Sequence, residues 1–250
     1  MEANSLAIRF GNFLYHKGFP LYNLLYKVFK RRQDAAEIRL LHRLVRPGDT
    51  ILDIGANIGF YSRLFSALAG PSGKVYSFEP DDTNFVHLLG NIQGLHNVEP
   101  IKKAVAESSG SLKLYTSPML NVDHRTYKVD DYAEEQDIVA TSVDDFVEGR
   151  FRVNLIKMDI QGFEVFALRG MQRTLEENEA IIILAELWPY GFRKAGCSCK
   201  TMVDFLSTLG FQIFEIAGDR LVEFDVAQIP WLEEQPFGYV RNILISRQTV

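Results

Sequence analysis

Cysteine is scarce in this chain of 250 residues, since only Cys197 and Cys199 occur and they stand one residue apart. Two cysteines placed so closely exclude a framework of disulfides. No further ligands stand near them at the spacing of a zinc site. The low cysteine content therefore predicts a protein of a reducing compartment, and we expect it to be cytoplasmic.

Long apolar runs and an excess of positive charge are also missing. No stretch approaches the roughly 20 apolar residues of a membrane span, and the first residues lack the pattern of a signal peptide. The net charge is −5, which is not the electrostatic footprint of a nucleic-acid-binding protein, so no nucleic acid partner is expected. With 47% hydrophobic and 24% charged residues, the composition is that of an ordinary globular protein.

The beginning of the chain differs in pattern from the rest. We predict a helical cap or extension over residues 1–45, followed by a single α/β domain over residues 46–250. The last helix of the cap is expected at residues 34–45, where Asp34 is a candidate N-cap and the sequence "RPGD" stops the helix. The oligomeric state does not follow from any of these patterns.

Residues 5–32 are aromatic and basic, and their apolar residues recur at roughly helical spacing. Gly18 and Pro20 divide this segment into two short helices. One interpretation is a cap that packs on the main domain. The other is an element that covers the substrate or makes peripheral contact with a membrane surface.

From residue 50 onward, apolar runs of strand length alternate with segments of helical spacing. This order predicts an α/β fold: a single doubly wound, mostly parallel seven-stranded sheet of Rossmann-like type with helices on both faces. An antiparallel hairpin is expected at its C-terminal end. Residues 111–142 look irregular and predict a small antiparallel excursion. Strands are expected at 50–54, 74–80, 98–106, 153–160, 180–187, 211–216, 221–224 and 239–246.

Four acidic side chains stand at the ends of separate predicted strands. Asp53, Glu79, Asp159 and Glu186 each lie at or next to the carboxyl end of a strand. In an open α/β sheet the ligand lies beyond those ends, at the point where the strand order reverses. An acid at one strand end has an ordinary structural explanation, because it stabilises a helix N-terminus. Four together indicate a binding site.

The stretch "TILDIGANIGFYS" predicts a strand, a glycine turn and a helix start, the usual surroundings of a cofactor. The turn departs from the dinucleotide fingerprint, because Asn57 stands where a glycine would let a pyrophosphate approach. A carboxylate at Asp53 repels phosphate but suits an ammonium group. Glu79 is placed to accept hydrogen bonds from a ribose diol. A ligand with a ribose, an ammonium and no phosphate fits, and S-adenosylmethionine is such a ligand.

Several longer stretches carry a resemblance to a known family. "DIGANIGFYS", "FEPDDTNFVHLLGNI", "AVAESSG", "LIKMDIQGFEVFALRG" and "ILAEL" resemble the FkbM-type methyltransferases over about residues 45–190. The resemblance implies a class I methyltransferase fold and S-adenosylmethionine-dependent O-methylation of hydroxyls, often on sugars or secondary metabolites. The expected partner is thus a small-molecule or glycan hydroxyl acceptor. This chain has Gln161 where the family usually has an acid.

The resemblance and the strand ends together define the expected site. Asp159 is expected to face the methionine end of the cofactor or the acceptor, and Lys103 and Val105 the adenine ring. Asp81 is expected to flank that ring too. The catalytic candidates are Asp159, Lys157 and Glu186. The cofactor-binding candidates are Asp53, Gly55, Ala56, Asn57, Gly59, Phe60, Tyr61, Glu79, Pro80, Ala104 and Asp159.

Other groups compete for the role of the base that removes a hydroxyl proton. Glu164 and His124 are further candidates, although an acid in a first helical turn and a histidine in a loop are ordinary structural features. Residues 188–190, "WPY", predict an aromatic wall or an ordinary rigid loop. Asp159 and Glu186 would be two oxygen ligands for a divalent ion, but no compact ligand motif supports a metal, and none is expected.

Three other functions remain open at this point. A non-catalytic module of the same fold would keep the pocket without turnover. An NAD(P)-dependent oxidoreductase is disfavoured by Asp53 and Asn57. A nucleic-acid methyltransferase is disfavoured by the acidic balance and by "MDIQG" in place of an N-P-P-Y-type tetrapeptide.

Overall fold

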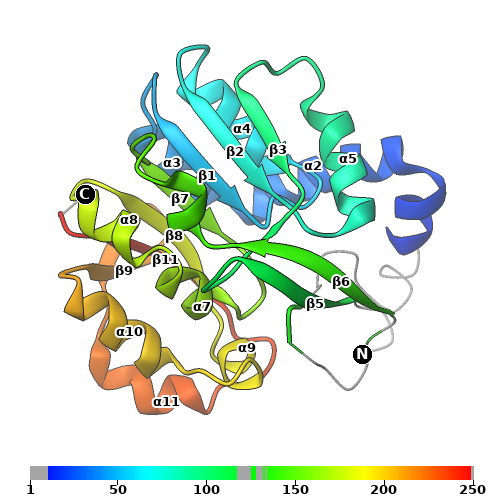
Figure 1. The fold of residues 1–250 in the computed structure, drawn as a ribbon. Coiled ribbons are helices and arrows are strands. Elements are labelled where there is room, and N and C mark those ends of the chain that lie inside the picture. The colour runs from blue at the N-terminus through cyan, green and yellow to red at the C-terminus, as the bar shows by residue number, and fades with distance from the viewer. Residues whose placement is uncertain (1–10, 117–124, 128–131, 133, 249–250) are drawn as a thin grey trace.

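The computed structural model describes residues 11–116, 125–127, 132 and 134–248 and has an α/β fold (Figure 1). Its main sheet runs in the order β10-β9-β11-β8-β7-β1-β2-β3. Five neighbouring strands, from β8 to β3, are parallel, as the alternation of strands and helices predicts. The strands are β1 (Thr50–Ile54), β2 (Lys74–Phe78), β3 (Val98–Ile101), β7 (Leu155–Met158), β8 (Ile182–Leu187), β9 (Gln212–Ala217), β10 (Arg220–Glu223) and β11 (Arg241–Ser246).

The main sheet differs from the predicted one in its number of strands. It has eight strands among the described residues, one in each of the eight predicted ranges, although the sheet as a whole was expected to contain seven. The hairpin of β9 and β10 adds an edge strand, while β11 inserts between β8 and β9 and is antiparallel to both. The C-terminal antiparallel hairpin is therefore present, and β10, its second strand, forms the edge of the sheet.

A second, smaller sheet has the order β4-β6-β5. The predicted strand over 98–106 is split, because β3 pairs with β2 in the main sheet whereas β4 pairs with β6 in the small one. The antiparallel pairing of β5 with β6 is the excursion expected within residues 111–142. The strands of this sheet are β4 (Ala104–Val105), β5 (Gly110–Thr116) and β6 (Glu134–Thr141).

The described helices fill the connections between strands. Residues 11–17 are helical, and Gly18 separates them from α2, in which Pro20 occupies the first turn, so the predicted division is confirmed. Residues 164–177 form two short helices, and between them the backbone at Gly170 lies against the carbonyl of Ala106. The helices are α2 (Phe19–Gln33), α3 (Ala35–Leu44), α4 (Phe60–Ala69), α5 (Asp82–Ile92), α6 (Val143–Val147), α7 (Glu164–Arg169), α8 (Gln172–Glu177), α9 (Pro189–Lys194), α10 (Cys199–Thr208), η1 (Val226–Gln228) and α11 (Ile229–Glu233).

The main sheet is covered on both faces by apolar side chains. Successive residues of a strand point to opposite faces, so Ile51 belongs to one buried cluster and Leu52 to the other. The first cluster packs residues of α3, α4 and α5 against the sheet, and the second packs residues of α6, α7, α8 and α10. Burial on both faces explains why β8 is an almost continuous apolar run.

The strand order reverses between β1 and β7, and this point positions the site. The chain runs outward from β1 through β2 to β3, and then returns to β7 on the other side of β1. The register pairs Asp53 of β1 with Lys157 of β7. The carboxyl ends of these strands thus bring a buried acid beside a buried lysine, at the switch point where open α/β sheets bind ligands.

Helices α2 and α3 lie beside that edge. Asp34 stands at the N-terminus of α3, as expected, but its side chain caps no backbone amide. The carboxylate instead accepts the hydroxyl proton of Tyr61 at 2.7 Å and pairs with Lys30 at 2.5 Å. Within the part of the chain that the structure describes, no helix is long and apolar enough to cross a membrane.

Candidate active site

A cavity of about 340 Å³ opens at the carboxyl ends of β1, β2, β7 and β8. That volume is within the usual range of small-ligand pockets. All three catalytic candidates line it, together with most of the predicted cofactor residues and with Lys103 and Val105. The predicted residues in its wall are Gly55, Ala56, Asn57, Phe60, Tyr61, Glu79, Pro80, Ala104, Lys157, Asp159 and Glu186.

Asp53 and Gly59, two predicted cofactor residues, stand behind this wall. Asp53 is fully buried beneath the loop, where one carboxylate oxygen accepts a hydrogen bond from Ser62 at 2.6 Å. Its other oxygen, Oδ1, has no partner among the described residues. A buried carboxylate oxygen without a donor fits an ammonium group or a water molecule that the ligand brings. Gly59 has φ +86° and begins α4 against Leu88.

The loop after β1 has its shape because the backbone of another strand approaches it closely. Gly55 has φ +78°, and a Cβ atom there would lie 2.0 Å from the carbonyl oxygen of Asp159. Asn57 is also left-handed, with φ 50°, and its side-chain oxygen accepts the amide proton of Ile58 at 2.7 Å. Asparagine tolerates that conformation because its side chain bonds to the local backbone.

Glu79 is held by two backbone amides. Its carboxylate accepts the amide protons of Asn57 at 2.8 Å and of Asp81 at 3.0 Å, one on each oxygen. The Asn84 side chain also bonds to this carboxylate, and since a carboxylate has about four acceptor positions, acceptor capacity remains for a ribose hydroxyl. Burial raises the pKa of Glu79 to about 8, with a smaller contribution from the charge of Asp81. Asp81 itself caps α5 and does not line the cavity.

We expect the affinity for S-adenosylhomocysteine to rise with pH through the pKa of Glu79. The ribose hydroxyls donate to the ionised carboxylate, and at pH 7 most of this group is protonated in the free protein because its pKa is about 8. Between pH 7 and pH 9 the association constant should increase about tenfold. Calorimetric titration across this range measures the slope. Glu79→Gln should bind more weakly and without this slope, and an unchanged slope in that variant would contradict the assignment.

Lys157 is a buried cation surrounded by carboxylates. Burial alone would lower the pKa of Lys157, but the charges of Asp159 and Asp53 outweigh it and raise that pKa. Its ammonium lies 3.5 Å from the carboxylate of Asp159 and 4.6 Å from the ring centre of Tyr61. Lys157 therefore stays protonated and cannot accept a proton from a substrate.

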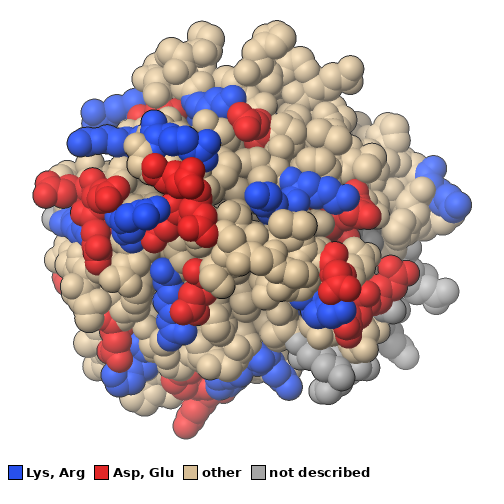
Figure 2. Space-filling model, in the orientation of Figure 1, with Lys and Arg blue, Asp and Glu red and all other residues tan. Residues whose placement is uncertain are grey.

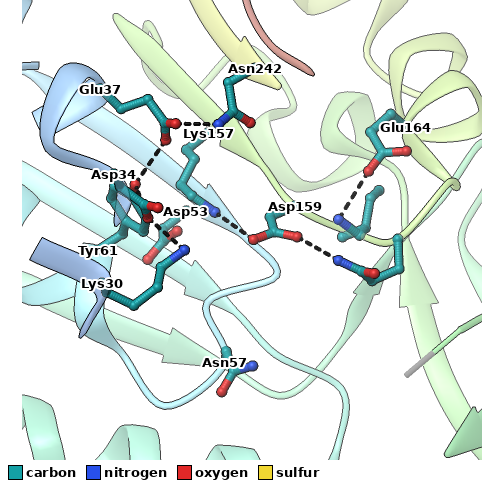
Figure 3. A network of polar contacts seen from close by, with 12 residues as sticks. Lys30, Asp34, Glu37, Asp53, Asn57, Tyr61, Lys157, Asp159, Glu164 and Asn242 are labelled. Carbon is teal, nitrogen blue, oxygen red and sulfur yellow. Dashed lines mark hydrogen bonds and ion pairs between the residues drawn. The ribbon is translucent and has the colours of Figure 1, made fainter. Parts of the chain in front are cut away.

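Asp159 is the ionised acid of the site (Figure 3). Burial would raise the pKa of Asp159, but the charge of Lys157 outweighs this and lowers it. The side chain points between Lys157 and Gln161, whose amide donates to Asp159 at 2.9 Å. The departure at position 161 thus places a neutral donor beside Asp159, where an acid would repel it.

Glu186, the third catalytic candidate, differs from Asp159 in the direction of its pKa shift. Burial raises the pKa of Glu186 well above its usual value, and the neighbouring charges of Asp159 and Glu164 raise it further. Glu186 is therefore the protonated acid of this group at neutral pH. Two carboxyls with opposite charge states beside one lysine are the arrangement expected where acid and base roles are divided.

Tyr61 connects this group to the N-terminal helices. Its hydroxyl lies 2.7 Å from a carboxylate oxygen of Asp34 and 2.9 Å from one of Glu37. A phenol has one proton to donate, so one of these two contacts needs a protonated carboxyl. Burial raises the pKa of Glu37 to about 7, with help from the charge of Asp34. Glu37 is therefore the carboxyl of this pair that takes up a proton more readily, and it also accepts a hydrogen bond from Asn242 (Figure 3).

The sequence left open whether residues 5–32 form a plain cap or cover the substrate, and it did not specify which residues of α2 line the site. Tyr26, Phe29, Lys30 and Gln33 of α2 line the cavity. Their only signal in the sequence is a basic and aromatic composition, which does not specify where the helix packs.

The remaining candidates lie away from the cavity or have local roles. Glu164 is fully buried and accepts the amide proton of Ile160 at 3.1 Å, so it stabilises the loop after β7. Residues 188–190 are not part of the cavity wall, since Trp188 is buried and donates to the carbonyl of Phe237 at 2.8 Å. His124 lies outside the described residues. Among the described residues, no group of three or more His, Cys, Asp or Glu is placed to hold a metal.

Comparison with known proteins assigns the family. The model of the FkbM methyltransferase domain matches residues 53–213, which include the end of β1, the loop after it, Asp159 and β8. This chain belongs to the FkbM methyltransferase family.

Two relatives show the spread of this family. The FkbM-family chain is 28% identical over 162 residues to the hexuronic acid methyltransferase AglP of Haloferax volcanii, covering 64% of this chain and 65% of that protein. It is 25% identical over 162 residues to the 31-O-demethyl-FK506 methyltransferase FkbM of Streptomyces tacrolimicus, covering 51% and 61%. The chain thus spans less than two thirds of the length of these curated relatives.

A solved structure supports the fold assignment. A putative rRNA methylase from Clostridium thermocellum superposes with a TM-score of 0.50 at 12% identity. The superposition covers 84% of this chain and 92% of that one. At such low identity the likeness concerns the class I methyltransferase fold alone.

Proposed function

We propose that this enzyme transfers a methyl group from S-adenosylmethionine to a hydroxyl of a sugar-containing or small-molecule acceptor. The two relatives named above act on a hexuronic acid and on a demethylated FK506. A hydroxyl acceptor needs a group that takes its proton. The observation that carries this function is the carboxylate of Asp159 in the cavity wall, held beside Lys157 and Gln161.

The cofactor would occupy the part of the cavity formed by the loop after β1 and by the end of β2. Glu79 would hold the ribose, and Asp53 would accept from the ammonium of the methionine portion beneath Gly55. Pro80 and the segment around Ala104 would border the adenine. When bound there, S-adenosylmethionine supplies a methyl carbon on a sulfonium, whose carbon–sulfur bond breaks with its electron pair staying on sulfur.

The residues of the chain would then manage the acceptor and its proton. Asp159 would take the proton of the acceptor hydroxyl on a carboxylate oxygen, so that the acceptor oxygen can accept the methyl group that the cofactor would supply. Lys157 keeps Asp159 ionised before the transfer, and Gln161 orients it. The protonated Glu186 would donate a hydrogen bond to the acceptor. Alignment of the acceptor with the methyl group supplies much of the acceleration, because the geometry is fixed in advance.

We infer that the acceptor is not a nucleic acid and that no metal assists the reaction. Figure 2 shows lysine and arginine interspersed with aspartate and glutamate over the visible face, without a stripe of one sign. The lysine of the site already supplies the positive charge that a metal would otherwise bring next to a hydroxyl.

The test has two steps. Calorimetric titration with S-adenosylhomocysteine and with NAD should show binding of the first ligand only, and Asp53→Ala should weaken it. Formation of S-adenosylhomocysteine from S-adenosylmethionine is then measured with a panel of hexuronic-acid glycans and small-molecule alcohols. Turnover with one of these acceptors supports the proposed reaction. Binding without turnover on any of them would favour a non-catalytic module, and NAD binding an oxidoreductase.

A further inference from the structure

Helix α2 exposes an apolar stripe on the side that faces away from the rest of the protein. The stripe consists of Leu21 and of the residues three, four and seven positions after it, which are Leu24, Leu25 and Val28. These spacings place all four on one face of the helix. All four are exposed, Leu24 to 61%. No residue of α2 is buried. Single exposed apolar residues are common on protein surfaces, but a contiguous group of them is not.

The opposite face of α2 is what attaches the helix to the protein. Asn23 and Asn91 of α5 exchange side-chain hydrogen bonds, at 2.6 and 3.4 Å. Phe19 stacks on His87 with ring centres 3.4 Å apart, and Tyr26 meets Phe60 edge-on at 6.5 Å. The stripe therefore contributes nothing to the attachment of the helix.

The charge around this stripe has one sign. Residues 11–33 contain Lys17, Lys27, Lys30, Arg31 and Arg32 and no acid, whereas the whole chain has a net charge of −5. Lys30 is paired with Asp34, while Arg31 and Arg32 are exposed. An apolar face with lysine and arginine beside it is the pattern of a helix that lies in the interface of an anionic bilayer.

The same helix forms part of the active-site wall. Tyr26, Phe29, Lys30 and Gln33 line the cavity, and Phe29 is also 60% exposed. If a surface binds the apolar stripe of α2, that surface lies beside the wall of the cavity that α2 forms.

We propose that α2 docks this enzyme on an anionic lipid bilayer. Leu21, Leu24, Leu25 and Val28 enter the boundary between headgroups and acyl chains, and Arg31 and Arg32 contact lipid phosphates. A second copy of the chain is a poorer occupant of this face, because it would bring two all-basic segments together. A neutral surface is also poorer, since it leaves the basic residues without partners.

Vesicle flotation with purified protein tests the docking. The probes are vesicles of phosphatidylcholine alone and vesicles with on the order of 30% phosphatidylserine, each at low and high salt. We expect binding to the anionic vesicles that weakens with salt. Leu24→Gln with Val28→Gln should lower the partition coefficient at least tenfold. Arg31→Gln with Arg32→Gln should lower it about 25-fold at low salt, since each basic residue contributes roughly fivefold.

The matched control removes two exposed apolar residues elsewhere. Val222 and Val226, near the C-terminal end, are 50% and 59% exposed, and their replacement by glutamine should leave partitioning unchanged. Binding of S-adenosylhomocysteine by every variant confirms that the fold is intact. No flotation of the unmodified protein, or equal flotation of the Leu24 and Val28 variant, would overturn membrane docking. If light scattering shows that the unmodified protein is a dimer and that the Leu24 and Val28 variant is a monomer, the stripe binds a second copy of the chain and membrane docking is overturned. Vesicle binding needs no acceptor, so its failure does not bear on methyl transfer.

Discussion

Replacing Asp159 by asparagine is expected to lower kcat about 10²- to 10⁴-fold, the usual contribution of a positioned general base. The asparagine keeps the size of the side chain but cannot take the hydroxyl proton. Lys157 holds the pKa of Asp159 below its usual range, so the carboxylate is ionised throughout the neutral range. The measurement is S-adenosylhomocysteine formation at saturating acceptor and cofactor, together with the affinity for S-adenosylhomocysteine.

The affinity measurement separates the two roles that position 159 can have. A general base predicts that kcat falls while S-adenosylhomocysteine binds as before. If Asp159 instead holds the methionine end of the cofactor, binding weakens and kcat at saturation is retained, which would contradict the base role. The control is Asp219→Asn, because Asp219 is a surface carboxylate whose side chain is 72% exposed and is paired with Arg39.

Gly55→Ala is expected to lower the free energy of unfolding by about 3 kcal/mol or more. A left-handed conformation at an alanine costs about 1–2 kcal/mol. The new methyl group would also lie 2.0 Å from the carbonyl oxygen of Asp159, so β1 and β7 would have to move apart. Urea unfolding gives the free energy. The affinity for S-adenosylhomocysteine should fall as well, since the loop that holds Glu79 moves with Gly55.

Alanine substitutions at two other glycines separate the two causes of this loss, which are the left-handed conformation of Gly55 and its close approach to the backbone of Asp159. Gly94 has φ +83° with nothing within 4 Å of an added Cβ, so Gly94→Ala measures the cost of the conformation alone. Gly90 lies in α5 with open space around it, and Gly90→Ala should stabilise by up to about 1 kcal/mol. Equal losses at Gly55 and Gly94 would show that the close approach of β7 is not the reason.

Local patterns in the sequence are sufficient for much of the site. The strand at 50–54, the glycine turn after it and the acids at strand ends are signals within a few residues of each other. Parallel pairing then brings these acids together, because the carboxyl ends of neighbouring strands meet at one edge of the sheet. Asp159 and Glu186 were predicted to converge for this reason, and both line the cavity.

Where two distant segments meet, local patterns were insufficient. The run at 98–106 has one continuous strand pattern, but its halves pair with different partners, β2 and β6. The aromatic residues at 188–190 resembled a binding wall, yet Trp188 turns toward Phe237 and is buried. Neither outcome is encoded in local spacing, since each depends on which distant segment packs alongside.

Short motifs are enough to predict the family and the strand ends that line the site, because each motif lies within a few consecutive residues. The charge states within the site depend on the folded arrangement. The parallel register brings Lys157 beside Asp53, and the packing of α3 brings Glu37 and Asp34 onto Tyr61. Burial and neighbouring charge are properties of that three-dimensional arrangement, and they set which of these groups holds a proton.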